Sequence, residues 1–300
     1  MRWGRTNFGV QAVLGAAWWV AVFTSPVVRE VTLGGLDPVL VAAVDIPLFV
    51  GASALAAAGL RTAAVVSTGW TVLVALALAG YATISAEAGW GVVAMAAASA
   101  GSVVALALVL LGRVPTEWLL RGPFAFRPAA ARPGTVAHLA ATLGQIAVFW
   151  GLFLVVIPLA AAFLEARWSI ALPVPDGSAA VGVVILLAAS AVGIWSAVVM
   201  STLGNGTPLP AAMPTSLVIA GPYRWVRNPM AVASIVQGVA VGLILASWVV
   251  VAYAIAGALF WNYAIRPHEE ADLERRFGDA FRRYRDTVRC WVLRVPVPRA

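Results

Sequence analysis

Eight long apolar segments follow one another along this 300-residue chain, with short polar stretches between them. Most hold roughly the 20 residues that an α-helix needs to cross about 30 Å of hydrocarbon. In hydrocarbon every backbone N–H and C=O group needs a partner within the protein, which a helix supplies. The sequence therefore predicts an all-α integral membrane protein with about eight transmembrane helices. The segments span residues 8–28, 38–60, 62–84, 89–111, 138–163, 179–203, 230–246 and 248–265.

Charged residues are too scarce for a soluble protein of this length. They make up 11% of the chain, against about 25% in an ordinary soluble domain. The net charge of +7 comes from arginine alone, since the chain has no lysine. The arginines lie between the apolar segments and in the C-terminal tail, so topology and anionic lipid headgroups explain them better than nucleic acid does. We expect membrane lipids as partners and no nucleic acid.

The positions of the arginines also predict the orientation of the chain. If the N-terminus is cytoplasmic, only Arg29 and Arg167 of the 20 arginines fall on the outer side. Cytoplasmic loops of membrane proteins collect positive charge, so both termini are expected in the cytoplasm. We therefore expect a multi-pass integral membrane protein that is located in the plasma membrane of a prokaryote.

A long loop rich in proline and arginine divides the sequence after the fourth apolar segment. We predict an N-terminal four-helix membrane module at residues 1–112, whose role the sequence does not reveal. A cytoplasmic linker at 113–137 and a second membrane module at 138–300 follow. The last two apolar segments are short and meet near Ser247 and Trp248, which predicts a helical hairpin.

Polar motifs cluster after the sixth apolar segment. Residues 204–208 read GNGTP, residues 221–229 read GPYRWVRNP, and residues 266–270 read RPHEE. The last motif opens a polar stretch with a stripe of apolar side chains at helical spacing. This pattern predicts an amphipathic helix along the cytoplasmic interface, with its apolar side inward. The stripe consists of Leu273, Phe277, Phe281 and Tyr284.

These motifs, in this order around a helical hairpin, resemble the isoprenylcysteine carboxyl methyltransferase and phospholipid methyltransferase superfamily. The resemblance covers about residues 200–294 and leaves the N-terminal module outside. It implies a membrane-embedded enzyme that uses S-adenosylmethionine as its cofactor. The implied reaction is methyl transfer to a small or lipid-like amphiphilic acceptor (a carboxylate, amine or thiol) at the cytoplasmic membrane face. The resemblance does not choose among these acceptors.

The resemblance also implies site residues. Gly204 and Gly206 lack Cβ atoms and so permit close approach to the nucleoside, although Gly204 could also simply end the sixth helix. The paired glutamates of the family belong to the cofactor site, although acids also favour a helix N-terminus for its dipole. The implied catalytic residues are Arg227, Asn228 and Glu270. The implied cofactor-binding residues are Gly204, Gly206, Tyr223, Arg227, Glu269 and Glu270.

Four positions depart from the family pattern, and one of them is Ala231, where many members have tyrosine. Many members have histidine where this chain has Asn228, so a mechanism that needs an imidazole base at that position cannot operate here. We therefore expect an acceptor that is already nucleophilic when it binds. The family ending V-x-R-W-x-P is matched by Val288 and Trp291, but Cys290 and Leu293 replace its arginine and proline.

The alternative from another functional class is a non-enzymatic membrane transporter or sensor that retains a methyltransferase-like core. Asp45, the one acid within an apolar segment, favours it, because acids inside a membrane are usually functional. Charged residues are otherwise almost absent from the segments, and no paired broken helices appear. Two distant histidines, His138 and His268, and a single cysteine predict no metal site. The sequence leaves the oligomeric state open.

Overall fold

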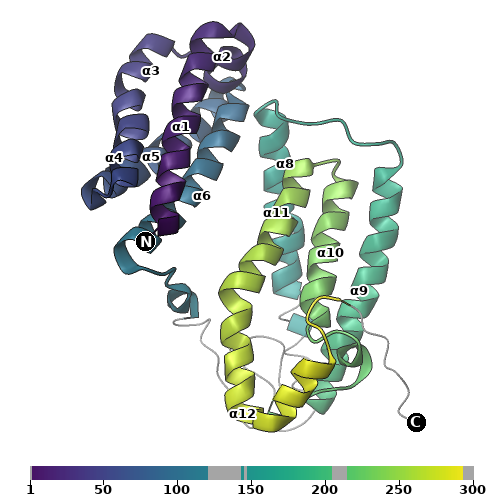
Figure 1. Ribbon diagram of the computed structural model, residues 1–300. Helices are drawn as coiled ribbons and strands as arrows, with labels where there is room; N and C mark the ends of the chain where they lie inside the picture. Colours follow the sequence, from purple (N-terminus) through teal and green to yellow (C-terminus); the bar gives the residue numbers. More distant parts are fainter. Residues whose placement is uncertain (1, 121–142, 145–146, 205–214, 293–300) are drawn as a thin grey trace. The chain divides into compact units, whose positions relative to one another are not determined.

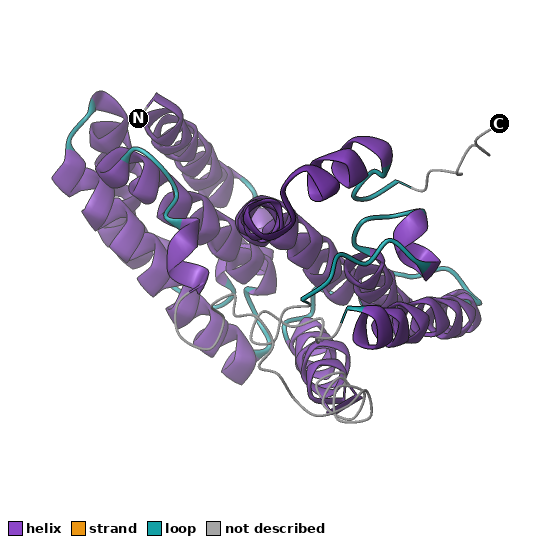
Figure 2. Cartoon of the chain, turned by 90° about the horizontal axis from the view of Figure 1, so that it is seen from below, coloured by secondary structure: helices purple, strands orange, loops and turns teal. Residues whose placement is uncertain are grey.

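The computed structural model describes residues 2–120, 143–144, 147–204 and 215–292. Within these ranges the chain is helical and contains no strand (Figures 1 and 2). It divides into two compact units, each described by itself below. The first unit comprises residues 1–115 and 163–171, and the second comprises residues 116–162 and 172–300.

The first unit is a helical bundle. The first predicted apolar segment, residues 8–28, does not form one continuous helix. The first helix ends at Thr24, and Ser25 caps a second helix that begins at Pro26. The third helix continues through a π-helical stretch into the fourth. The elements are α1 (Arg2–Thr24), α2 (Pro26–Leu33), α3 (Pro38–Asp45), η1 (Ile46–Gly51), α4 (Ala52–Ala58), α5 (Arg61–Ser85) and α6 (Gly89–Leu111).

Buried polar side chains join the helices of this unit. The Gln11 amide donates to the hydroxyls of Ser53 (3.1 Å) and Ser67 (3.2 Å), and its oxygen accepts from Ser102 (2.7 Å). One glutamine of α1 thus contacts α4, α5 and α6. Hydrogen bonds of this kind link helices where the surrounding lipid is as apolar as the side chains.

Asp45 is tied into the same bundle. Its two carboxylate oxygens accept hydrogen bonds from the indoles of Trp19 (2.8 Å) and Trp70 (2.7 Å), on α1 and α5. The side chain is buried, so these donors satisfy a group that would otherwise be costly to bury. This acid therefore has a structural function in joining three helices.

The second unit holds the remaining helices. The helix that begins at Ala147 and ends at Arg167 contains a π-helical stretch. Its residues from 163 onward belong to the first unit. The elements are η2 (Thr116–Leu120), η4 (Gly151–Val156), α8 (Ile157–Arg167), α9 (Ser178–Leu203), η6 (Gly221–Arg224), α10 (Pro229–Ile244), α11 (Trp248–Phe260), η7 (Trp261–Ile265) and α12 (Arg266–Thr287).

Helices α9, α10 and α11 form the apolar part of this unit (Figure 1). The turn between α10 and α11 gives the expected hairpin, and the Ser247 hydroxyl caps α11 by accepting from the Val250 N–H (3.1 Å). Gln237 of α10 donates to the hydroxyl of Ser190 on α9 (2.9 Å). These contacts fix the helices that carry the polar motifs at their ends.

Seven of the described helices are long and apolar enough to cross a membrane, and α10 is a shorter apolar helix of 16 residues. The chain is therefore an integral membrane protein, as predicted. The seventh long helix joins α11, η7 and α12 in one run of 40 residues, Trp248–Thr287. At 1.5 Å per residue that run is about 60 Å long, twice the hydrocarbon thickness. The polar helix α12 thus extends beyond the membrane-spanning part.

Helix α12 bends within the stripe of apolar side chains that the sequence predicted. Gly278 has φ +50° and ψ −126°, a conformation that essentially only glycine adopts. Leu273 and Phe277 lie before the bend, and Phe281 and Tyr284 lie after it. The two halves still pack their apolar side chains together, with Phe281 and Tyr284 buried. The expected inward apolar face is thus formed by a bent helix.

Candidate functional site

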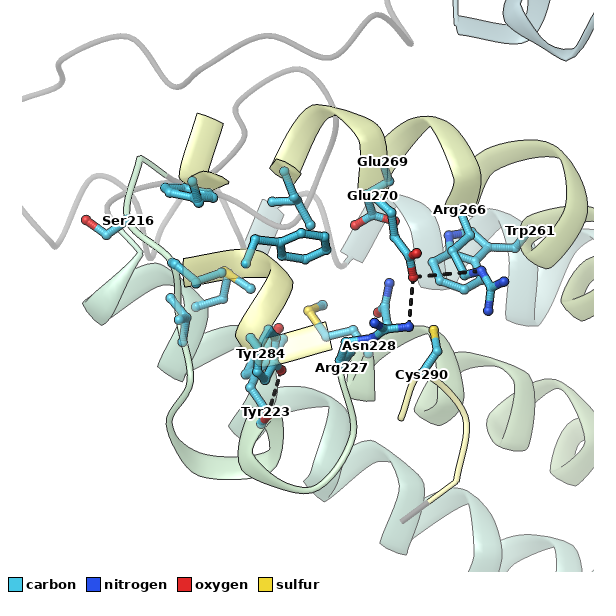
Figure 3. A pocket seen from close by; sticks show the side chains of 17 residues that line it. Ser216, Tyr223, Arg227, Asn228, Trp261, Arg266, Glu269, Glu270, Tyr284 and Cys290 are labelled. Atoms are coloured by element: carbon cyan, nitrogen blue, oxygen red, sulfur yellow. Dashed lines mark hydrogen bonds and ion pairs between the residues drawn. The ribbon is translucent and has the colours of Figure 1, made fainter. Parts of the chain in front are cut away.

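A cavity in the second unit gathers most of the residues that the motifs single out (Figure 3). It is lined from the end of α9, from the chain between residue 216 and the start of α10, from the run of η7 through α12, and from the tail that follows α12. Its polar lining consists of Ser216, Tyr223, Arg227, Asn228, Arg266, Glu269, Glu270 and Cys290. Its apolar and aromatic lining consists of Met200, Leu217, Val218, Met230, Trp261, Leu273, Phe277, Phe281 and Tyr284.

The segment before α10 is shaped by its own sequence. Gly221 has φ +53°, and a Cβ atom there would lie 2.9 Å from Cγ2 of Val199, so this turn requires glycine. Trp225 packs edge-on against Trp195 of α9, with ring centroids 5.7 Å apart. Asn228 then caps α10, its Oδ1 accepting from the Ala231 N–H (3.0 Å). The segment is thus held at both ends, with its polar side chains at the cavity.

Arg227 is held rigidly by three contacts. Its Nη2 lies 3.0 Å from Oε1 of Glu270, its Nη1 donates to the carbonyl of Arg285 (3.3 Å), and its backbone N–H donates to the carbonyl of Arg289 (3.1 Å). The side chain is 12% exposed. Its Nε is buried without a hydrogen-bond partner among the described residues. Arg224, by contrast, is exposed and does not line the cavity.

Tyr223 and Tyr284 form a buried pair. The Tyr284 hydroxyl donates to the backbone carbonyl of Tyr223 (2.6 Å), which joins the segment before α10 to the second half of α12. Burial raises the pKa of both phenols well above the ordinary value. Both side chains therefore stay neutral at physiological pH and act as walls and hydrogen-bonding groups rather than as bases.

The paired glutamates have different surroundings, although they are neighbours near the start of α12. Glu270 pairs with Arg227 and lies 3.9 Å from Nε of Arg266. Glu269 has no ion-pair partner in the described part of the chain. Burial, together with the negative charges of Glu270 and Asp272, raises its pKa to about 7. Glu269 can therefore hold a cation or exchange a proton near neutral pH.

Arg266 and Cys290 are cavity residues that the motif analysis did not assign to the site. Arg266 precedes Glu270 by one helical turn, and that spacing is the signal that could have identified it. Cys290 is buried, and desolvation raises the pKa of its thiol despite a hydrogen bond from Arg266. Cys290 reaches the cavity because the tail turns back: Trp291 donates to Asn262 (2.7 Å).

The glycine motif is only partly visible. Gly204 ends α9 with a helical φ of −88°, and its carbonyl accepts from the Thr215 N–H (2.8 Å). It does not line the cavity, and its hydrogen bond joins the end of α9 to the segment before η6. Gly206 lies outside the described residues, and its part in cofactor binding stays a prediction. His268 also lies outside the cavity lining, with its ring near the Thr116 hydroxyl (2.9 Å).

The predicted site residues Tyr223, Arg227, Asn228, Glu269 and Glu270 thus come together around one cavity, and their roles stay predictions. Within the described residues, no group of three or more His, Cys, Asp or Glu side chains is arranged to hold a metal ion. No curated protein and no solved structure matches the chain. Residues 178–280, which run from the start of α9 into α12, match the model of the phospholipid methyltransferase family. The match confirms, for this C-terminal part, the resemblance to the isoprenylcysteine carboxyl and phospholipid methyltransferase superfamily and indicates a methyltransferase.

Proposed function

We propose that this protein is an S-adenosylmethionine-dependent methyltransferase that acts on a lipid-like or hydrophobic amphiphilic acceptor at the cytoplasmic face of the membrane. One observation carries the proposal. The region that matches the methyltransferase family contributes Tyr223, Arg227, Asn228, Glu269 and Glu270 to one cavity.

The residues around the cavity fit this cofactor. Glu269 presents a carboxylate without an ion-pair partner in the described chain, and Arg227 has a buried Nε that no described acceptor satisfies. Phe277 and Phe281 supply an aromatic wall for a flat base. Ions of both signs and an apolar wall are what a charged nucleoside with an aromatic ring requires.

S-adenosylmethionine, when bound, supplies an electrophilic methyl group on a sulfonium sulfur. The chain's own residues then position and desolvate the reactants. The ion pair of Arg227 and Glu270 is held to the backbone of Arg285, so its charges keep a fixed direction. Asn228 has its Oδ1 occupied by the Ala231 N–H, which leaves its NH₂ group to donate to a ligand. No imidazole is among the described residues that line the cavity, in keeping with an acceptor that is nucleophilic when it binds.

The distribution of charge supports a cytoplasmic location of the cavity. Arg266, Arg275, Arg276, Arg282, Arg283 and Arg285 all lie on α12, beyond the apolar part of the seventh long helix. Positive charge of this density favours the cytoplasmic side. We further propose that both termini lie on that side and that the membrane is the plasma membrane of a prokaryote.

The transporter alternative loses its main support. Asp45 suggested it, but both of its oxygens are satisfied by the indoles of Trp19 and Trp70. No described feature of the first unit favours a transport path over a structural function.

Cofactor binding tests the proposal. The protein is purified in detergent, and S-adenosylmethionine is titrated into the wild type, Glu270→Gln and the control Glu30→Gln, whose side chain is exposed in the first unit. We expect the wild type and the control to bind equally. Glu270→Gln should bind about tenfold more weakly or worse, since it removes a charged partner of Arg227. If the wild-type protein shows no affinity for the cofactor, the proposal that it is a methyltransferase is refuted.

The acceptor is identified by the label it carries. Membranes that contain the protein are given cofactor with a labelled methyl group. A volatile, base-labile label indicates a carboxyl ester, whereas a stable label in the lipid extract indicates an amine or another headgroup. Membranes with the Glu270→Gln protein serve as the control and should incorporate far less label.

A further inference from the structure

A groove in the first unit shares no residue with the cavity described above. It lies between the start of α1 and the end of α4, at one end of the unit (Figure 1). Two arginines and a hydroxyl line one part of it, and small or apolar residues line the rest. The lining consists of Arg2, Arg5, Thr6, Gly9, Val10, Val13, Leu14 and Ala57. A groove of this composition suits an amphiphile with a negatively charged end.

The sequence of α1 arranges these side chains by depth. Arg2, Thr6, Gly9 and Val13 recur at spacings of four, three and four residues, which places them on one face of the helix. The distance along the axis from Arg2 to Val13 is about 17 Å. That is about half of the hydrocarbon thickness, the depth of one leaflet. The charges therefore lie at the level of lipid headgroups, and the apolar residues lie at the level of acyl chains.

Arg5 is held in position by the end of α4. Its Nε donates to the carbonyl of Ala57 (2.9 Å) and its Nη2 to that of Ala58 (2.8 Å). Gly59, with φ +116°, lets the guanidinium approach, since a Cβ there would lie 3.2 Å from Nη2. The described hydrogen bonds use Nε and Nη2, so Nη1 is available to a ligand. This preorganisation lowers the entropic cost of binding.

Capping of α4 accounts for Arg5 but not for Arg2. The side chain of Arg2 is exposed, and its guanidinium forms no hydrogen bond or ion pair with a described residue. Val10, Val13 and Leu14 are exposed as well, so the first unit itself does not cover the apolar part of the groove. Both parts of the groove are thus open to the same ligand.

Negative charge lies elsewhere in the first unit. Glu30 and Asp37 lie between α1 and α3, and Glu87 lies between α5 and α6, where its carboxylate accepts from the Gly35 N–H (2.9 Å). These connections are at the opposite end of α1 from the groove. None of the described residues that line the groove is acidic. An anionic headgroup therefore matches the lining, whereas the ammonium of a zwitterionic headgroup would meet only positive charge there.

We propose that this groove binds one anionic phospholipid, with its phosphate against Arg2 and Arg5 and an acyl chain along Val10, Val13 and Leu14. The proposal goes beyond methyl transfer, because it uses no residue of the cavity. It gives the first unit a binding site of its own.

Native mass spectrometry in detergent tests the headgroup part. The full chain is titrated with phosphatidylglycerol and with phosphatidylcholine of the same acyl chains. We expect the wild type to bind one phosphatidylglycerol about tenfold more tightly than phosphatidylcholine. Arg2→Gln should weaken phosphatidylglycerol binding by about fivefold, and Arg2→Lys should preserve it, since each cation near the lipid surface contributes about that factor. The control Arg61→Gln, on an exposed arginine of α5 outside the groove lining, should stay within about twofold.

The acyl-chain part is tested at Gly9. A Cβ atom there would lie 3.6 Å from that of Ala57, an ordinary contact, so Gly9→Ala is the matched control. Gly9→Leu fills the groove without changing its charge and should weaken phosphatidylglycerol binding by about fivefold or more. Glycerol 3-phosphate, which has the phosphate but no acyl chain, should not displace the lipid. All variants are checked for an unchanged thermal transition.

Any of four results would overturn the proposal. The first is equal binding of the two lipids by the wild type, and the second is equal effects of Arg2→Gln and Arg61→Gln. The third is equal lipid binding by Gly9→Leu and Gly9→Ala, and the fourth is displacement of the lipid by glycerol 3-phosphate, which would identify a site for free phosphate. None of these results bears on the binding of S-adenosylmethionine, so the methyltransferase is judged separately.

Discussion

Single residues decide the chemistry of the cavity, and Glu269 shows how. Its neighbour Glu270 is compensated by two arginines, whereas Glu269 has no ion-pair partner among the described residues and lies buried near the negative charges of Glu270 and Asp272. Two adjacent carboxylates thus differ in what they can do at neutral pH, since environment rather than residue type sets their charge.

This difference predicts a pH-dependent stability. The pKa of Glu269 rises from 4.5 to about 7 on folding, so the folded protein binds more protons between these values and loses stability as the pH rises through them. Glu269→Gln removes that loss. At pH 8.5 the variant should be more stable than the wild type by on the order of 2 kcal/mol. At pH 5 the gain should be much smaller. Thermal unfolding in detergent measures both, and equal gains at the two pH values would contradict the assigned pKa.

Gly221 makes a second prediction at this scale. Alanine would be strained at φ +53°, and its Cβ would press on Val199 and Trp195. Gly221→Ala should lower the stability by about 1–3 kcal/mol and weaken cofactor binding, because the segment that carries Tyr223 and Arg227 must shift. Gly257→Ala on α11, where a Cβ meets no atom within 4 Å, is the matched control. Equal effects of the two substitutions would disprove the assigned role of Gly221.

Among the helices, α12 connects the membrane-spanning part to the cavity. Its bend at Gly278 brings Phe281 and Tyr284 back to the lining that Glu269 and Glu270 begin. Glu274, before the bend, pairs with Arg282 (3.2 Å) and Arg285 (2.9 Å) after it, which holds the bend angle.

Removing the glycine of the bend should therefore damage the site from a distance. A Cβ atom at position 278 would meet no atom within 4 Å. Gly278→Ala should therefore lower the free energy of unfolding by about 1–3 kcal/mol through backbone strain alone. We expect a straighter α12, weaker cofactor binding and faster proteolysis after residue 278. Glu274→Gln should have a smaller effect, since partly exposed ion pairs contribute about 1 kcal/mol or less. Unchanged cofactor affinity in Gly278→Ala would show that the bend does not position the site.

The sequence predicted the helices better than it predicted the contacts between them. Apolar length alone located the spans, because hydrocarbon imposes the same requirement on each of them. It missed the bend at Gly278, since a glycine within a regular stripe leaves the apolar periodicity intact. It also missed Arg266 as a site residue and the two indoles that satisfy Asp45, because those contacts arise only when distant segments pack.

On the scale of the whole molecule, topology is the property that labelling can test. In a Cys290→Ser background, single cysteines at Val114 and Ala171, both exposed, should lie on opposite sides of the membrane. A membrane-impermeant maleimide added to intact cells should label Ala171→Cys alone, and lysis should expose Val114→Cys. Labelling of both positions in intact cells would refute the predicted orientation.

The return of the tail to Arg227 has a consequence for biosynthesis. The backbone N–H of Arg227 donates to the carbonyl of Arg289, and Cys290 completes the cavity wall. A nascent chain still emerging from the ribosome cannot make these contacts, even after α9, α10 and α11 have been inserted. Membrane integration and acquisition of a complete pocket are therefore separate events in time, and the second waits until translation has passed residue 290.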